Sequence, residues 1–232
     1  MLRGLMLIGV VLAGPAAAQD CRIALTIGLD VSNSVDADEY ALQTGGMAAA
    51  LVAPEVQAAF FAAPDRFVAL QVYEWSGRRR QQVQIDWIEI RRPEDLARAA
   101  DALRAQPRST DSYPTAIGRA LEFGAAQLDR GPACAQSKID IAGDGENNDA
   151  EEPETALGPA RAAITVNALA IGERAEDLRV YYLENVARGP GAFVEVARDH
   201  ADFERAMRRK LVRELTEAQV SGRPDPRARR WR

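Results

Sequence analysis

The chain has 232 residues, of which 47% are hydrophobic and 27% are charged. This composition can bury a substantial core, which excludes a mostly disordered chain and a small disulfide-held peptide. The 29 Lys and Arg residues against 34 Asp and Glu residues give a net charge of −5, so no nucleic-acid partner is expected. The single histidine, His200, excludes a zinc centre built from several histidines, and we expect it to be structural.

Residues 1–19 have the features of a secretory signal peptide. Arg3 supplies a positive charge, residues 5–13 form the apolar run LMLIGVVLA, and residues 16–18 are the small alanines that a signal peptidase requires. The apolar run is too short for a membrane span of roughly 20 residues, and no later stretch predicts one. We therefore expect cleavage near Gln19 and a periplasmic or secreted protein.

The two cysteines, Cys21 and Cys134, have different meanings in different compartments. In an exported protein an even pair indicates a disulfide, whereas in the cytosol it indicates two buried thiols. A bridge would close a loop of more than 100 residues, which stabilises a fold by at most about 4–5 kcal/mol. A lipid anchor on Cys21 is a weaker alternative, because Asp20 precedes it where a lipoprotein signal needs a small residue.

Apolar segments of strand length alternate with helical patterns along the rest of the chain. Residues 23–31 form a near-continuous apolar run, as in a strand buried on both faces. Residues 35–61 are helical, with a kink or a second start at Pro54. Residues 66–75 predict a second strand, and the alternating residues 82–90 predict an edge strand paired with it in a hairpin.

The second half of the chain repeats this alternation. It predicts helix 93–105, helix 115–128 with Thr115 as its N-cap, strand 138–142, helix 153–163, strand 165–171, helix 176–186, strand 193–197 and helix 202–219. The predicted fold class is α/β: one doubly wound domain over residues 20–220, with a mostly parallel six-stranded sheet, one antiparallel edge strand and helices on both faces. Residues 221–232 carry five Arg and one Asp, and we expect a flexible basic tail.

Oxygen-bearing side chains follow the ends of two predicted strands. Asp30, Ser32 and Ser34 end or follow the first strand, Asp144 follows the fourth, and Thr115 begins a helix between them. Because ligands bind outside the carboxyl ends of the strands in an open α/β sheet, we expect these side chains to converge. No sulfur or imidazole accompanies them, so such a site suits Mg²⁺, Mn²⁺ or Ca²⁺.

The same residues carry a resemblance to a known family. The phrase D-x-S-x-S from Asp30 to Ser34, the phrase T-A-I-G-x-A-L from Thr115, and the Asp-Gly at Asp144 resemble the von Willebrand factor type A (vWA) domain. The resemblance covers roughly residues 21–219. The phrases WSG, GDGENND and GPGAFV resemble a secreted bacterial branch of unknown function.

The resemblance implies a metal-ion-dependent adhesion site (MIDAS). Ser32 and Ser34 would bind the ion directly through their hydroxyls, and Thr115 would bind it directly or through water. Asp30 and Asp144 would hold coordinated waters. Mg²⁺ is the expected ion, with Mn²⁺ or Ca²⁺ as alternatives, and its open position would take a carboxylate from a protein or peptide partner.

The resemblance has three further consequences. It makes the first and fourth strands parallel neighbours, which places Cys21 and Cys134 at the same end of the sheet, opposite the metal, and favours a disulfide. Gly143 stands where the family commonly has Thr, which removes a hydroxyl from the surroundings of the metal. Thr110 is an alternative to Thr115, but only Thr115 begins the helical phrase.

Charged and aromatic residues are expected around the same end of the sheet. An aromatic residue beside a basic cluster can recognise an acidic partner, although an exposed hairpin turn is the alternative. The nearby acids could tune the metal, repel wrong partners or be ordinary solvated loop residues. The residues assigned to this partner-binding rim are Trp75, Arg78, Arg79, Asp111, Glu146 and Asp149.

Three classes of function fit these residues. The favoured class is a monomeric binding module, not an enzyme, that holds a divalent cation and through it an acidic group of a partner. The second is a scaffold that holds no metal, for which Gly143 is the motivation. The third is a metal-dependent phosphoryl hydrolase with Asp30 as nucleophile. It is disfavoured because Ser32 stands where such enzymes usually carry a second Asp, and no supporting Lys is evident.

Overall fold

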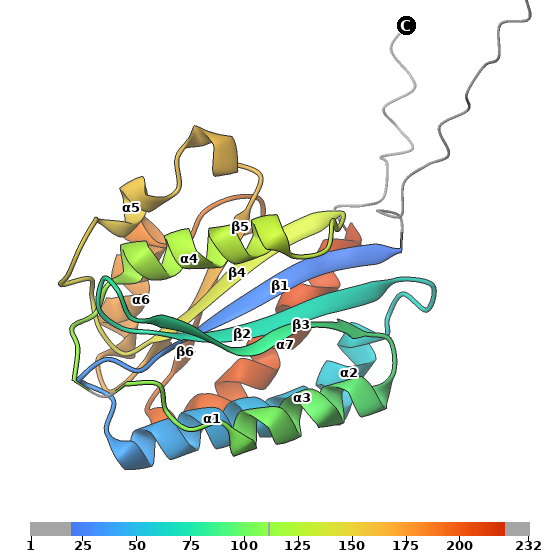
Figure 1. The fold of residues 1–232 in the computed structure, drawn as a ribbon, viewed down its shortest axis with the longest axis horizontal. Coiled ribbons are helices and arrows are strands. Elements are labelled where there is room, and N and C mark those ends of the chain that lie inside the picture. Colours follow the sequence, from blue (N-terminus) through green and yellow to red (C-terminus); the bar gives the residue numbers. More distant parts are fainter. Residues whose placement is uncertain (1–19, 111, 221–232) are drawn as a thin grey trace, which may run out of the picture.

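The computed structural model describes residues 20–110 and 112–220 (Figure 1). The predicted signal peptide, Asp111 and the predicted tail lie outside the described residues. The strands are β1 (Cys21–Asp30), β2 (Phe67–Trp75), β3 (Gln81–Ile90), β4 (Gln136–Gly143), β5 (Thr165–Ile171) and β6 (Val194–Ala197). The helices are α1 (Ala37–Leu51), α2 (Pro54–Phe60), α3 (Pro93–Ala105), α4 (Ile117–Arg130), α5 (Pro153–Ala156), α6 (Ala175–Asn185) and α7 (Phe203–Val220), with 3₁₀ turns η2 (Pro159–Arg161) and η3 (His200–Asp202).

The six strands form one sheet in the order β3-β2-β1-β4-β5-β6. β2 and β3 pair antiparallel, and all other neighbours are parallel. The predicted doubly wound α/β class with one antiparallel edge strand is therefore confirmed. The chain runs outward from β1 to β3 and then returns to the other side of β1 as β4. The strand order thus reverses between β1 and β4, where the ligand crevice of such sheets lies.

Two apolar layers hold the helices against the two faces of the sheet. β1 is buried over its whole length, and its alternate residues from Ile23 to Leu29 face a layer that includes α1, α2, α3 and α7. Ile139 and Ile141 of β4 face the opposite layer, which includes α4 and α6 (Figure 1). Because both faces are covered, the central strands are mostly apolar, with a few buried polar residues such as Thr26 and Asp140.

Two helix starts differ in detail from the sequence-based prediction. The predicted helix 35–61 divides at Pro54, which takes the first helical position of α2, where a missing N–H costs nothing. This is the second of the two alternatives for Pro54. The prediction of Thr115 as an N-cap was wrong, because α4 begins at Ile117 and the Ile117 amide donates to the Asn147 side chain at 2.8 Å.

The predicted helix 153–163 is also shorter than expected. It consists of α5 and η2, each about one turn long, separated by residues 157–158. Gly158 precedes Pro159, and this Gly-Pro step favours an extended residue before the second turn, which interrupts the helix. In the described part of the chain, no helix combines the length and apolarity that a bilayer crossing requires.

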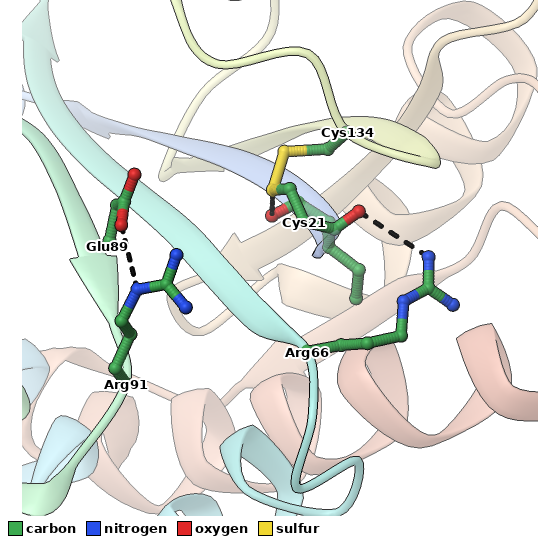
Figure 2. Close-up of a disulfide and its surroundings, with 6 residues drawn as sticks. Cys21, Arg66, Glu89, Arg91 and Cys134 are labelled. Carbon is green, nitrogen blue, oxygen red and sulfur yellow. Dashed lines mark hydrogen bonds and ion pairs between the residues drawn. A yellow bond between two sulfur atoms is a disulfide. The ribbon is translucent and has the colours of Figure 1, made fainter. Parts of the chain in front are cut away.

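Cys21 and Cys134 form a disulfide, which confirms the predicted pairing. Their Cα atoms are 4.6 Å apart, at the amino ends of β1 and β4. Figure 2 shows the bridge at this edge, where the Arg66 side chain donates to the Cys21 carbonyl at 3.5 Å. The disulfide thus joins the two central strands at the end of the sheet opposite Asp30 and Asp144.

Candidate functional site

The predicted oxygen-bearing residues lie together at the carboxyl ends of β1 and β4. Asp30 is the last residue of β1, and Ser32 and Ser34 lie in the loop that leads to α1. Asp144 directly follows β4, and Thr115 lies two residues before α4. Because β1 and β4 are parallel neighbours, residues from distant parts of the sequence share this one edge.

Short contacts link all five residues into one oxygen cluster. The Ser34 hydroxyl donates to Asp144 Oδ1 at 2.6 Å, and its oxygen lies 3.1 Å from the Ser32 hydroxyl. The Thr115 hydroxyl lies 3.3 Å from Ser32 Oγ, and the Ser32 amide donates to Asp30 Oδ1 at 2.8 Å. The cluster runs from Asp30, which has no exposed surface, to the solvent-exposed Ser34.

Asp30 is a buried carboxyl group that forms no ion pair within residues 20–110 and 112–220. Its Oδ2 atom is buried and has no hydrogen-bond partner among the described residues. Burial and the nearby charge of Asp144 raise the pKa of Asp30 to about 8, although the Ser32 hydrogen bonds and the charge of Arg108 act in the opposite direction. A buried oxygen without a donor or a cation costs free energy, and a bound cation would offset this cost.

The loop that follows β4 positions Thr115 as well as Asp144. Asn148 Oδ1 accepts from the Thr115 amide at 2.8 Å, and Asn147 Oδ1 accepts from the Ile117 amide at the start of α4, also at 2.8 Å. The Asn148 amide donates back to the Thr115 carbonyl at 2.9 Å. These two asparagines therefore replace an N-cap on α4, a role that sequence analysis did not assign to them.

Arg108 fixes the loop that carries the serines. Its Nη2 atom donates to the carbonyls of Val31, Ser32 and Val35 at distances of 3.0, 3.1 and 2.8 Å. Its Nε atom donates to the carbonyl of Thr110, the residue considered as an alternative ligand. Sequence analysis missed Arg108 because its partners are backbone carbonyls, which leave no signal in the sequence.

Trp75 does not belong to a partner-binding rim, and this prediction was wrong. Its side chain has no exposed surface and packs in the layer of α4 and α6. The predicted strand 66–75 included Trp75, but the side chain was expected at the exposed end of the sheet, whereas β2 directs it into the core. Trp75 is therefore a core residue that pairs with Asp30 in the sheet, next to the oxygen cluster.

Arg78 and Asp149, both assigned to the rim, bind each other. Arg78 Nη2 and Nε donate to Asp149 Oδ1 at 2.8 and 3.1 Å, and the Arg78 amide donates to Oδ2 at 3.0 Å. This pairing lowers the pKa of Asp149, and the two charges largely cancel. The pair joins the β2–β3 hairpin to the loop after β4. Arg79 and Glu146 are exposed, and Asp111 lies outside the described residues.

The oxygen cluster fits a small divalent cation. Its three hydroxyls are neutral hard ligands, and its two carboxyl groups supply negative charge. A hollow of about 750 Å³ adjoins the cluster, and its lining includes the neutral polar residues Asn33, Tyr113 and Asn148 and the acidic Glu146. Across residues 20–110 and 112–220, no three His, Cys, Asp or Glu side chains form a metal-binding group. The candidate site would therefore depend on its hydroxyls for direct ligands.

Comparison with known proteins places the chain in a family. The family model described as "Protein of unknown function (DUF1194)" matches residues 20–219. A search of curated proteins gives no match.

Solved structures resemble the chain at low sequence identity. Proximal thread matrix protein 1 from the mussel byssus, with a zinc-occupied MIDAS motif, is 16% identical with a TM-score of 0.59, over 86% of this chain and 47% of that chain. The von Willebrand factor type A structure from Catenulispora acidiphila is 17% identical with a TM-score of 0.54, over 84% and 43%. BatB from Bacteroides thetaiotaomicron is 16% identical with a TM-score of 0.56, over 84% and 99%. The matched region thus spans less than half of the mussel and Catenulispora chains, and these similarities show a vWA-like fold.

Proposed function

The chain belongs to the DUF1194 family and has a vWA-like fold, and on this premise we propose that it is an exported binding module. It binds one divalent cation, Mg²⁺ by preference, through Asp30, Ser32, Ser34, Thr115 and Asp144. Through that cation it binds a carboxylate of a protein partner. The disulfide agrees with export, because such bridges persist in oxidising compartments.

The observation that carries the proposal is the unpartnered Oδ2 atom of Asp30 beside a cluster of hydroxyls. Ser32, Ser34 and Thr115 would hold the cation directly, while Asp30 and Asp144 would balance its charge and hold its waters. Such a site has few charged direct ligands and keeps several waters, which suits Mg²⁺ better than larger ions. The bound cation would act as a Lewis acid toward a carboxylate oxygen of the partner.

A binding function is better supported than catalysis by Asp30. A nucleophilic carboxylate must reach the phosphorus atom of its substrate. Asp30 has no exposed surface, its Oδ1 atom accepts the Ser32 amide, and its Oδ2 atom is buried. The hydroxyls lie between Asp30 and solvent, so they are the groups that meet a ligand first.

Calorimetry and thermal melts test the proposal directly. The mature exported chain would be titrated with Mg²⁺, Mn²⁺ and Ca²⁺, beside the variant Ser32→Ala. A ligand at a hundred times its dissociation constant stabilises a fold by about 2.7 kcal/mol, which raises the melting temperature of a domain this size by roughly 5–10 °C. We expect this shift in the wild type and its loss in Ser32→Ala.

Ser137→Ala is the matched control, because Ser137 lies on β4 near the end of the sheet opposite the cluster. It should bind metal as the wild type does. Absence of both heat and melting shift at millimolar metal would overturn the proposal and favour the scaffold that holds no metal. A partner captured in Mg²⁺ and released by EDTA should also lose binding when its carboxyl groups are amidated.

A further inference from the structure

Gly143 has no side chain, which leaves a small space beside Asp30. The hydroxyl of Tyr182 on α6 lies at the edge of this space. A Cβ atom at position 143 would lie 2.8 Å from the Tyr182 hydroxyl, 3.1 Å from Asp30 Oδ2 and 3.3 Å from Trp75 Cζ2. These distances are shorter than ordinary van der Waals contact. Glycine at this position therefore lets the phenol of Tyr182 approach the unpartnered carboxyl oxygen of the site.

Tyr182 reaches this place from α6 and is itself fully buried. Its hydroxyl donates to the Gly145 carbonyl at 3.0 Å, one residue beyond Asp144. The neighbouring Tyr181 hydroxyl accepts from the Asn147 amide at 3.2 Å. Two consecutive tyrosines of α6 thus hold the loop that supplies Asp144 and positions Thr115.

We propose that Tyr182 is a positioning residue of the metal site, and that Gly143 is the glycine that admits its hydroxyl. This inference rests on the proposed function. Tyr182 acts through its neighbours: it holds the Gly145 carbonyl, and hence Asp144, and it places a hydroxyl beside Asp30. In this chain a phenol from α6 supplies the hydroxyl that a Thr at position 143 would otherwise contribute.

The charge environment keeps this hydroxyl protonated. Burial, reinforced by the nearby Asp30 and Asp144, raises the pKa of the Tyr182 phenol well above its ordinary value. The hydroxyl therefore remains protonated and can donate a hydrogen bond at neutral pH.

The first test compares two tyrosine-to-phenylalanine variants by Mg²⁺ calorimetry and by melting without metal. Removing a group that orients metal ligands typically weakens binding roughly ten- to hundredfold, so Tyr182→Phe should raise the Mg²⁺ dissociation constant at least about tenfold. Tyr73→Phe is the matched control, because Tyr73 is also fully buried and its hydroxyl also donates to a backbone carbonyl, that of Ala120, at 2.8 Å. Both variants should lower the metal-free melting temperature similarly, but only Tyr182→Phe should weaken metal binding.

The second test moves the hydroxyl from α6 to β4. The double variant Gly143→Ala/Tyr182→Phe removes the hydroxyl and with it the shortest of the three contacts of an added Cβ atom, while the contacts with Asp30 and Trp75 remain, so it should bind Mg²⁺ at least about tenfold more weakly than the wild type. Gly143→Ser/Tyr182→Phe differs from it by one hydroxyl on β4 and should recover most of the lost affinity.

The outcomes separate the two proposals. If the wild type does not bind Mg²⁺, the proposed function fails and this inference fails with it. If the wild type binds but Tyr182→Phe binds equally well, or if the Ala and Ser double variants bind alike, the positioning role alone is overturned.

Discussion

Two aspartates in the central strands, Asp30 at the end of β1 and Asp140 inside β4, are both without exposed surface and have opposite surroundings. Asp30 faces hydroxyls and a second carboxyl group, and it forms no ion pair with a described residue. Asp140 forms an ion pair with Lys210 of α7, which is also fully buried. Burial raises the pKa of both groups, to about 8 for Asp30 and about 7 for Asp140, and the Lys210 ammonium opposes the rise at Asp140.

Asp140 belongs to a buried cluster of charged side chains in which acids are paired with lysines of the same chain. Lys210 Nζ also lies 3.3 Å from Glu214 Oε2, and Glu214 Oε1 accepts from Asn167 Nδ2 at 2.7 Å. The Lys138 ammonium donates to the Glu214 carbonyl at 2.6 Å. Two acids and two lysines therefore balance one another between the sheet and α7.

The comparison separates a structural carboxyl group from a binding one. A buried acid that has its own lysine contributes to the fold and needs no ligand. A buried acid surrounded by neutral hydroxyls near the surface has no ion-pair partner among the described residues, and the charge of Arg108 only partly offsets the effect of burial on its pKa. Asp30 is therefore the position where an external cation would supply the balance.

Removal of the Lys210 ammonium should have the largest effect on the free energy of unfolding. Lys210→Met leaves Asp140 and Glu214 buried without their ammonium partner, and breaking a buried pair from one side typically costs about 3–5 kcal/mol. Denaturant unfolding would measure this loss. Arg174→Met is the control: it breaks an ion pair with Asp177 in which the side chains are 87% and 72% exposed, so it should change stability by less than about 1 kcal/mol. A small effect of Lys210→Met would remove the distinction between the two aspartates.

Acid should remove the stabilisation that comes from a third kind of carboxyl group, Asp202, which pairs with an arginine near the surface. Arg205 holds the pKa of Asp202 down to about 2, and the Arg198 amide contributes. Since this is below the unfolded value of about 3.9, the stabilisation is present above pH 4 and is lost as the pH falls from about 4 to 2. Asp202→Asn should reduce stability at neutral pH by on the order of 1–2 kcal/mol and flatten the acid limb of the stability curve. Asp177→Asn should leave that limb unchanged, and an equal change in both variants would contradict the assignment.

Asparagine at each of the two buried aspartates should affect stability and metal binding in opposite ways. Asp30→Asn removes an acid that has no cation, so the metal-free free energy of unfolding should stay within about 1 kcal/mol of the wild type. Asp140→Asn removes one of the two acids that pair with Lys210 and should cost about 3 kcal/mol, the lower end of the usual range for breaking a buried pair, because Glu214 still pairs with Lys210. Mg²⁺ calorimetry should show the reverse pattern: binding is lost in Asp30→Asn and retained in Asp140→Asn. Retained binding in Asp30→Asn would contradict its role in the site.

The fold class and the meeting of the five oxygen-bearing residues could be predicted from the sequence. Continuous apolar runs mark strands that are covered on both faces, and in a parallel sheet the residues that follow such strands share one edge. The D-x-S-x-S phrase at Asp30 and the Asp-Gly at Asp144 therefore located the candidate site. The disulfide followed from the same adjacency of β1 and β4.

The contacts between side chains from distant parts of the sequence became evident only in the tertiary structure. The Trp75 side chain lies in the core because β2 directs it into the layer of α4 and α6, and Arg78 pairs with Asp149 of the loop after β4. Arg108 binds backbone carbonyls, and the Tyr182 hydroxyl fits against a glycine. Neither contact has a sequence signature, because each depends on the packing of a distant segment. Local periodicity determines where helices and strands form, whereas the partner of a buried charge or hydroxyl depends on which elements pack together in three dimensions.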